Sequence, residues 1–412
     1  MIKNALILSI IASATLFASD EIDELKKQIA QLQKSIETIE QKQQEAAQKE
    51  LNEKVASASN KTSSFSQSAF LPDMSFILDA SAVSRNIKNS EYKTYNILGF
   101  TETPAVGSET EIPFNKDRGF NFNYAEVALH SVIDPYFDAD VIFHIQPDAL
   151  EVEEAFVTTR ELPYGLRVKA GKFRSAFGRI NAIHQHAWNF TSQPLVYEAL
   201  IGGEGINSAG IQMQWIAPTD TYIMVGGEAM QRLTPESPNE GNNLYIGYVK
   251  SSIDIGDTSI LGGVSLAHSK YFEDEVAEIV NDSDIYGVEL TIKSILDSYS
   301  SITLQSELLS RTEQTVSGNV TQAGLYSELV YKINNNYSTG IRYDLLYKNL
   351  YNQPDDLDRY TAMVEYKPFE FSKIRLQFTH DKSKEFNGER KDIDEVLLGI
   401  TIEAGAHGAH AF

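Results

Sequence analysis

The chain has no cysteine, and its basic residues are few beside its acidic ones. Among 412 residues, the absence of Cys excludes a disulfide framework, a thiolate metal site and a cysteine nucleophile. The 35 Lys and Arg residues face 57 Asp and Glu residues, which gives a formal charge of -22. Such a chain is a poor electrostatic match for nucleic acid phosphates. After the first 19 residues, no stretch approaches the roughly eighteen apolar residues of a membrane-spanning helix.

Aromatic residues are abundant instead. The chain contains 20 Tyr and 20 Phe residues at a mean hydropathy of -0.27. This combination suits a sheet with one apolar face and one wet face. We find no G-x-S-x-G motif and no nucleophile–base pair that stands out from the other charged residues. We therefore predict neither an enzyme nor a cofactor.

The N-terminus has the composition of a secretory signal peptide, which we assign to residues 1–19. Lys3 precedes a short apolar run, and the small residues Ala18 and Ser19 end the segment. We therefore predict an exported protein.

Residues 20–56 show a helical repeat. Their apolar residues are spaced alternately three and four apart, as at the a and d positions of a coiled coil: Ile22, Leu25, Ile29, Leu32, Ile36 and Ile39. One interpretation is an amphipathic helix that packs on its own domain. The narrow stripe favours self-association, and Ile at the a positions favours three strands. We therefore predict a periplasmic coiled coil of a homotrimer, followed by a Ser-rich linker at 57–69.

From Phe70 onward the apolar residues recur at every second position, in about sixteen segments. Ile341 and Tyr343 share one face of a segment, while Arg342 and Asp344 share the other. Short joins mostly alternate with long ones, and we place the long joins near 87–118, 176–208, 232–242, 270–283, 312–321, 349–358 and 383–393. Aromatic residues gather at the short joins: Tyr136, Tyr164, Tyr222, Tyr299, Tyr337, Phe369 and Phe371.

These features distinguish two architectures. A soluble sandwich would need two opposed sheets built from sixteen consecutive hairpins, and it gives no reason for aromatic rings at one end of every hairpin. A closed barrel removes the exposed sheet edges, and its aromatic girdle lies at a membrane interface. We therefore predict that residues 70–412 form an all-β transmembrane barrel of about 16 antiparallel up-and-down strands. Its expected location is the outer membrane of a Gram-negative cell.

The last segment, DEVLLGITIEAGAHGAHAF, is predicted to be the closing strand. Val396, Leu398, Ile400 and Ile402 alternate with polar or small residues, and the chain ends at Phe412. A C-terminal aromatic resembles the sorting signal that the barrel-assembly machinery recognises. Two interpretations stay open: the strand runs to Phe412, or it ends near Glu403 and a short tail follows.

The long join at 176–208 is the best candidate for a functional segment. Its length and its aromatic residues favour a loop that folds into the lumen and narrows it. The candidate constriction residues are Lys172, Arg174, Arg179, His184, His186, Trp188, Tyr197 and Glu198. The basic residues could attract anions, or they could pair with lumen carboxylates such as Glu153 and Glu154 and brace the loop. The ion preference therefore stays open.

Histidine spacing gives little support for a metal site. His184 and His186 are two residues apart, and His407 and His410 are three apart. A site needs three or four ligands, so two separate pairs are better interpreted as scattered polar histidines, and no metal site is predicted.

Several segments carry a resemblance to known families. GKFRSAFG and NFTSQPLVYEALIGGEGINSAGIQMQW are similar to the third-loop region of phosphate-selective porins. FLPDMSFILDAS, FNFNYAEVALHSVIDPYFDADVIFH, EEAFVTTRELPYGLRVKAGKF and GAHGAHAF resemble barrel proteins labelled zinc-regulated outer-membrane receptors. The resemblance implies a porin-like barrel in contact with outer-membrane lipids. Our first hypothesis is passive diffusion of small hydrophilic solutes or ions. The alternative is a zinc-handling surface protein without general pore activity.

Overall fold

The structure is a computed structural model that describes residues 72–101, 110, 112–147, 149–233, 241–274, 279–348, 357–386 and 388–405. All of them belong to the unit Phe70–Phe412. The predicted signal peptide (1–19), coiled coil (20–56), linker (57–69) and C-terminal Phe412 lie outside the described residues and stay predictions.

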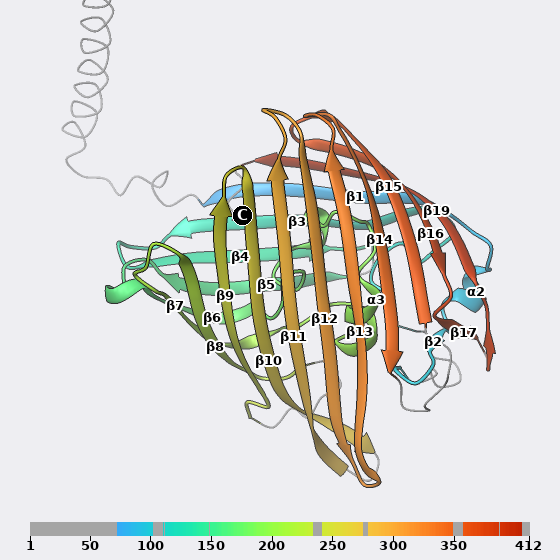
Figure 1. The fold of residues 1–412 in the computed structure, drawn as a ribbon, viewed down its shortest axis with the longest axis horizontal. Coiled ribbons are helices and arrows are strands. Elements are labelled where there is room, and N and C mark those ends of the chain that lie inside the picture. Colours follow the sequence, from blue (N-terminus) through green and yellow to red (C-terminus); the bar gives the residue numbers. More distant parts are fainter. Residues whose placement is uncertain are drawn as a thin grey trace, which may run out of the picture. The chain divides into compact units, whose positions relative to one another are not determined.

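Sixteen of the described strands form one closed antiparallel barrel, in agreement with the predicted fold class (Figure 1). In chain order they are β1 (Asp73–Arg85), β3 (Gly119–Val132), β4 (Phe137–Ile145), β5 (Leu150–Thr159), β6 (Leu166–Arg174), β7 (Asn207–Ile216), β8 (Tyr222–Met230), β9 (Leu244–Ile255), β10 (Thr258–Asp274), β11 (Ile279–Ile295), β12 (Ser301–Thr315), β13 (Gly318–Lys332), β14 (Tyr337–Lys348), β15 (Leu357–Phe369), β16 (Ser372–Asp381) and β19 (Ile393–Gly405).

The remaining elements are short. The strands β2 (Asn96–Ile97), β17 (Lys384–Phe386) and β18 (Glu389–Arg390) form a small separate sheet that joins the first long connection to the last. The helices are α2 (Asn89–Tyr92), α3 (Leu195–Leu200) and two 3-10 turns at Pro163–Gly165 and Gln185–Ala187. Among the described residues, no helix has the length and apolar composition that crossing a membrane requires.

The barrel closes between its first and last strands. β1 pairs with β19 in a register that places Leu78 opposite Ile402 and Ala82 opposite Leu398. The prediction of a closing strand is therefore confirmed. β19 extends to Gly405, and the residues after it lie outside the described part of the chain.

The two faces of the barrel wall differ sharply. On β14, Ile341 is 60% exposed, whereas its neighbour Arg342 is only 3% exposed. Because successive side chains of a strand point to opposite faces, the apolar residues cover the outside and the charged residues line the lumen. The aromatic residues predicted at the short joins are all exposed there: Tyr136, Tyr164, Tyr222, Tyr299, Tyr337, Phe369 and Phe371. This outer surface matches a hydrocarbon layer with an aromatic interface.

Two predicted long joins were wrong. The segments at 270–283 and 312–321 are largely strand, because β10 runs to Asp274 and β13 begins at Gly318, three residues after Thr315. Their outward side chains include polar pairs such as Lys270 and Asp282, which lie 2.9 Å apart. A strand keeps its backbone hydrogen bonds where it extends beyond the hydrocarbon layer into water. The polar residues in these segments therefore indicated strands with a water-exposed outer face rather than loops.

Candidate functional site

Residues 175–206, between β6 and β7, fold inside the barrel, and we call them the lumen loop (Figure 1). The loop includes α3 and the 3-10 turn at Gln185–Ala187. Its side chains Phe177, Leu195 and Tyr197 are buried in one apolar cluster with the inward-facing Leu309 and Tyr326. Burying each such side chain contributes on the order of 2 kcal/mol. The barrel interior is therefore partly filled by a packed core rather than by water alone.

One buried carboxylate on β12 accepts hydrogen bonds from two parts of the lumen loop and from β13. Glu307 Oε2 accepts hydrogen bonds from the Arg179 backbone N–H at 2.8 Å and the Tyr197 hydroxyl at 2.7 Å. Glu307 Oε1 accepts from the Ile180 backbone N–H at 3.0 Å and the Tyr326 hydroxyl at 2.6 Å. Four donors thus converge on one side chain that is 2% exposed. Hydrogen bonds to a charged group are stronger than neutral ones, so Glu307 is the main polar anchor of the loop.

Guanidinium groups on β14, β15 and β16 hold the opposite part of the loop. Arg342 donates to the Ser192 carbonyl at 2.7 Å, and Arg359 donates to the Gln193 carbonyl at 2.8 Å. Arg375 on β16 donates to the Trp188 carbonyl at 3.0 Å. These side chains satisfy loop carbonyl groups that have no strand partner, which fixes the loop backbone against the wall.

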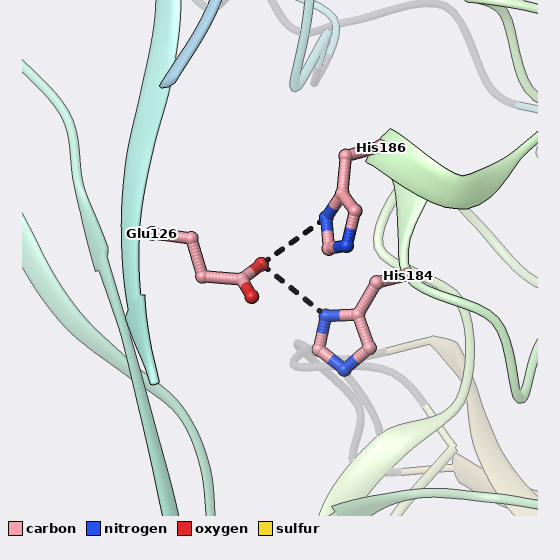
Figure 2. Close-up of side chains that lie close together, drawn as sticks. All are labelled: Glu126, His184 and His186. Atoms are coloured by element: carbon pink, nitrogen blue, oxygen red, sulfur yellow. Dashed lines mark ion pairs between the residues drawn. The ribbon is translucent and has the colours of Figure 1, made fainter. Parts of the chain in front are cut away.

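A second contact region joins the loop to β3 and β4. Its members Glu126, His144, His184 and His186 are called the histidine cluster here. Figure 2 shows that the imidazoles of His184 and His186 both turn Nδ1 toward the same oxygen of Glu126. The distances to Glu126 Oε2 are 3.4 Å from His184 Nδ1, 3.5 Å from His186 Nδ1 and 3.2 Å from His144 Nε2. All four side chains are buried.

Carboxylates also face the other sides of two of these rings. His184 Nε2 lies 2.8 Å from Glu154 Oε2, and His144 Nδ1 lies 3.6 Å from Glu153 Oε2. Arg174 pairs with Glu153 as well, and its backbone N–H donates to Glu154 at 2.6 Å. The rings of His144 and His184 are therefore oriented from both sides.

Two β-bulges aim these carboxylates into the lumen. The pairing of β1 with β3 shifts by one residue at Asn123, so that Phe122 points outward while Glu126 points inward. The pairing of β4 with β5 shifts in the same way, which lets the consecutive Glu153 and Glu154 both reach the cluster. A bulge inserts one unpaired residue and re-aims the side chains that follow it.

Burial and neighbouring charge act in opposite directions on the loop histidines. Burial by itself lowers the pKa of His184, but Glu126 and Glu154 outweigh it and raise that pKa to about 10. For His186 burial prevails, so its pKa is lowered despite Glu126. The two rings therefore differ in proton affinity, although they face the same carboxylate.

The predicted constriction residues lie at separate contact points rather than in one ring. Lys172 and Arg174 lie on β6, where the Lys172 ammonium donates to the Val152 carbonyl at 2.7 Å. Trp188 is buried and donates to the Ile183 carbonyl at 2.8 Å. The other predicted residues lie on the loop: Arg179 and Tyr197 at Glu307, His184 and His186 in the histidine cluster, and Glu198 against Lys384 and Arg359.

Glu126 and His144 were missed at the sequence level. A signal was present, because the outward apolar residues change from even positions at Phe120 and Phe122 to odd positions at Val127. A change of parity within one strand indicates a bulge, and it would have placed Glu126 in the lumen.

Cavities lie on both sides of the lumen loop. One of about 330 Å³ lies toward the short turns, and its lining includes Asp140 and Lys169. Another of about 90 Å³ lies toward the long connections. Between the loop and β1, β16 and β19 there is a gap of about 10 Å³, whose polar lining includes Asp79, His186 and Lys373. That is about the space that one water molecule needs.

Comparison with known proteins assigns the chain to a protein family. A protein of Aquifex aeolicus, described as uncharacterized, is 39% identical over 392 residues, covering 85% of this chain and 82% of that protein. The chain belongs to the family of this Aquifex aeolicus protein. No protein-family model matches the chain, so the family is defined here by this relative and by the fold.

Solved structures of outer-membrane proteins share this family's fold. OmpT of Vibrio cholerae with loop L8 deleted, described as an outer membrane protein, has a TM-score of 0.53 at 12% identity over 82% of this chain and 100% of its own. An anion-selective porin from Comamonas acidovorans has 0.53 at 11% identity over 80% and 98%. OmpF of Salmonella typhi in complex with daunomycin has 0.51 at 11% identity over 82% and 99%. The expected porin-like barrel is confirmed as a fold, whereas the narrower resemblances stay predictions.

Proposed function

We propose that the protein is an outer-membrane channel for passive diffusion of small hydrophilic solutes or ions. The observation that carries this proposal is a closed barrel with an apolar outside and a charged inside. Within a bilayer every backbone polar group needs an internal partner, and a closed barrel provides it. At sixteen strands the cylinder is wide enough for water. The porin folds among its structural neighbours support the same conclusion.

In this proposal the lumen loop sets the size limit. The loop is anchored to the wall at Glu307, at the arginines of β14–β16 and at the histidine cluster. The polar gap beside β1, β16 and β19 is the narrowest passage, and the cavities on either side serve as vestibules. Solutes much larger than water then require displacement of the loop. Such a pore has a small conductance for its strand number.

The charges along this path are mixed. Asp140 and Glu154 line the larger vestibule together with Arg167 and Lys169. Because a ring of one sign gives strong ion selectivity, a mixed lining predicts weak selectivity. The sign of that selectivity is left to measurement.

Recording from planar bilayers tests the channel. The folded full chain, purified in detergent, should produce discrete current steps that are proportional to voltage, and heat-denatured protein from the same preparation is the control. A reversal potential under a salt gradient then gives the ion preference. Protein that inserts in folded form, judged by its heat-modifiable migration in gels, but gives no steps would refute the proposal.

We also propose that the protein is a homotrimer, inserted in the outer membrane through recognition of Phe412 by the barrel-assembly machinery. The heptad spacing of residues 22–39 supports three chains, and one structure of OmpT of Vibrio cholerae is described as a trimer form. Native mass spectrometry should give three chains, and the double variant Ile29→Asn with Ile36→Asn should shift the mass toward one chain. A monomeric wild-type protein would contradict the trimer.

A further inference from the structure

The hydrogen-bond geometry of the histidine cluster turns ligand atoms toward one point. His184 Nε2 lies at hydrogen-bond distance from Glu154 Oε2, 2.8 Å, so this nitrogen donates to Glu154. Nδ1 of the same ring faces Glu126 Oε2. A divalent metal ion that displaces the Nδ1 proton is bound by this nitrogen and by the carboxylate together.

For His184 and His186, the distances to Glu126 Oε2 fit a shared metal ion better than a shared proton. A proton shared between nitrogen and oxygen holds the two atoms about 2.7–3.2 Å apart. Two ligands bound to one zinc ion at about 2.05 Å and at the tetrahedral angle lie about 3.3 Å apart. Glu126 Oε2 lies 3.4 Å from His184 Nδ1, 3.5 Å from His186 Nδ1 and 3.2 Å from His144 Nε2. The ligand atoms of Glu126, His184 and His186 are all within 4.8 Å of one another.

The surrounding residues provide what a metal site needs. A histidine that binds a metal usually gives its other ring nitrogen to a carboxylate, and Glu154 occupies that place for His184 at 2.8 Å. Glu153 Oε2 lies farther from His144 Nδ1, at 3.6 Å. The carboxylates of Glu126, Glu153 and Glu154 together with the guanidinium of Arg174 sum to two negative charges. A divalent ion balances that sum in a site where all the side chains are nearly buried.

We propose that Glu126, His184 and His186 form a binding site for one divalent transition-metal ion of the zinc type, and that His144, whose Nε2 lies 3.2 Å from Glu126 Oε2, completes it as the fourth ligand. Three imidazoles and one carboxylate are a donor set that zinc, copper and nickel accept, whereas magnesium and calcium require oxygen ligands. Because His184 and His186 lie on the lumen loop and Glu126 lies on β3, the ion clamps the loop to the barrel wall (Figure 2).

Calorimetric titration with ZnCl₂ tests the site on the folded full chain in detergent, after treatment with EDTA. The wild-type protein should bind one ion per chain with high affinity. His184→Ala with His186→Ala removes two of four ligands and should abolish this binding. Glu126→Gln, which keeps the side-chain shape, should weaken it at least 100-fold, and Glu154→Gln should weaken it about 10–100-fold by releasing a ligand ring.

A matched variant separates this site from the other histidine pair. His407→Ala with His410→Ala removes the same number of imidazoles near the C-terminus and should leave the affinity unchanged. The proposal is overturned if the folded wild-type protein binds no zinc. It is also overturned if binding survives in both Glu126→Gln and His184→Ala with His186→Ala, or if it disappears in the C-terminal variant. Heat-modifiable migration in gels identifies folded samples, and Glu154→Gln serves as an additional near-isosteric variant.

This inference is independent of channel activity, because the isotherm is recorded without a membrane. A barrel that conducts but binds no zinc contradicts the metal site alone. A barrel that binds zinc but gives no current steps contradicts the proposed function alone.

Discussion

The most direct perturbation of the lumen loop is Glu307→Gln. The change is nearly isosteric, so it leaves no cavity, but it replaces one acceptor oxygen with an NH₂ donor. Each carboxylate oxygen accepts one backbone N–H and one Tyr hydroxyl. The hydroxyl can turn and accept from the new NH₂ group, but the backbone N–H then faces another donor. A buried donor without an acceptor costs about 1–3 kcal/mol, so the docked loop should lose about 1–3 kcal/mol. Since about 1.4 kcal/mol is tenfold in an equilibrium, the undocked population should rise at least about fivefold.

Limited proteolysis with chymotrypsin measures that population. Phe177, Trp188, Phe190 and Tyr197 are buried cleavage sites in the docked loop. When opening is fast relative to cleavage, the rate of cutting follows the open population, so it should rise by the same factor. Single-channel recording of the same protein should show larger and noisier currents.

Asp140→Asn is the matched control. Asp140 is also a lumen carboxylate, but its partner is His130 on the neighbouring strand, at 2.8 Å. The control removes the same charge without touching the loop anchor. Equal cleavage rates for wild type, Asp140→Asn and Glu307→Gln would refute the reasoning, because Glu307 would then not hold the loop.

Three further perturbations address the loop and the vestibule. Gly178 has a φ of 60°, and a β-carbon there would collide with the Tyr197 hydroxyl, so Gly178→Ala should increase loop cleavage at least tenfold in the same chymotrypsin assay. Burial by itself would raise the pKa of Glu198, but Lys384 and Arg359 outweigh it and lower that pKa to about 2. In an unfolded chain the pKa of a Glu side chain is about 4.3. The stabilisation of the docked loop by ionised Glu198 is therefore complete above about pH 4.3 and is lost as the pH falls toward 2. Loop protection against pepsin should therefore decline across that range, and Glu198→Gln should flatten the decline. Lys169→Gln should shift the reversal potential toward cations and Asp140→Asn toward anions, and equal shifts of the same sign would contradict the vestibule assignment.

Much of the barrel could be predicted from alternation alone. The period of two fixes which side chains face outward, so the opposed faces of Ile341 and Arg342 follow directly from the sequence. The pairing of β1 with β19 follows because an open sheet of this size would leave two edges exposed. The ends of β10 and β13 could not be predicted in this way, because polarity on both faces is shared by loops and by strands that extend into water.

The interior contacts were harder to predict for a different reason. Alternation places Glu307 in the lumen, but it does not say that four donors from the loop and from β13 will meet there. The histidine cluster depends on two bulges, and one inserted residue reverses the face of everything that follows it. His184 and His186 were recognised as a pair by spacing, whereas Glu126 and His144 enter the cluster through tertiary structure.

The position of the loop anchors has a consequence for assembly. The strands that hold the lumen loop most firmly, β12 to β16, are consecutive hairpins, whereas the final contact joins β1 to β19 from opposite ends of the barrel sequence. Local hairpins form before distant pairings, because short loops lose less entropy on closure. A partly assembled, curved sheet can therefore already bind the lumen loop before β1 pairs with β19. The gap of about 10 Å³ borders β1 and β19, which join last in this order, so we expect the barrel to close around a loop that is already bound to the other strands.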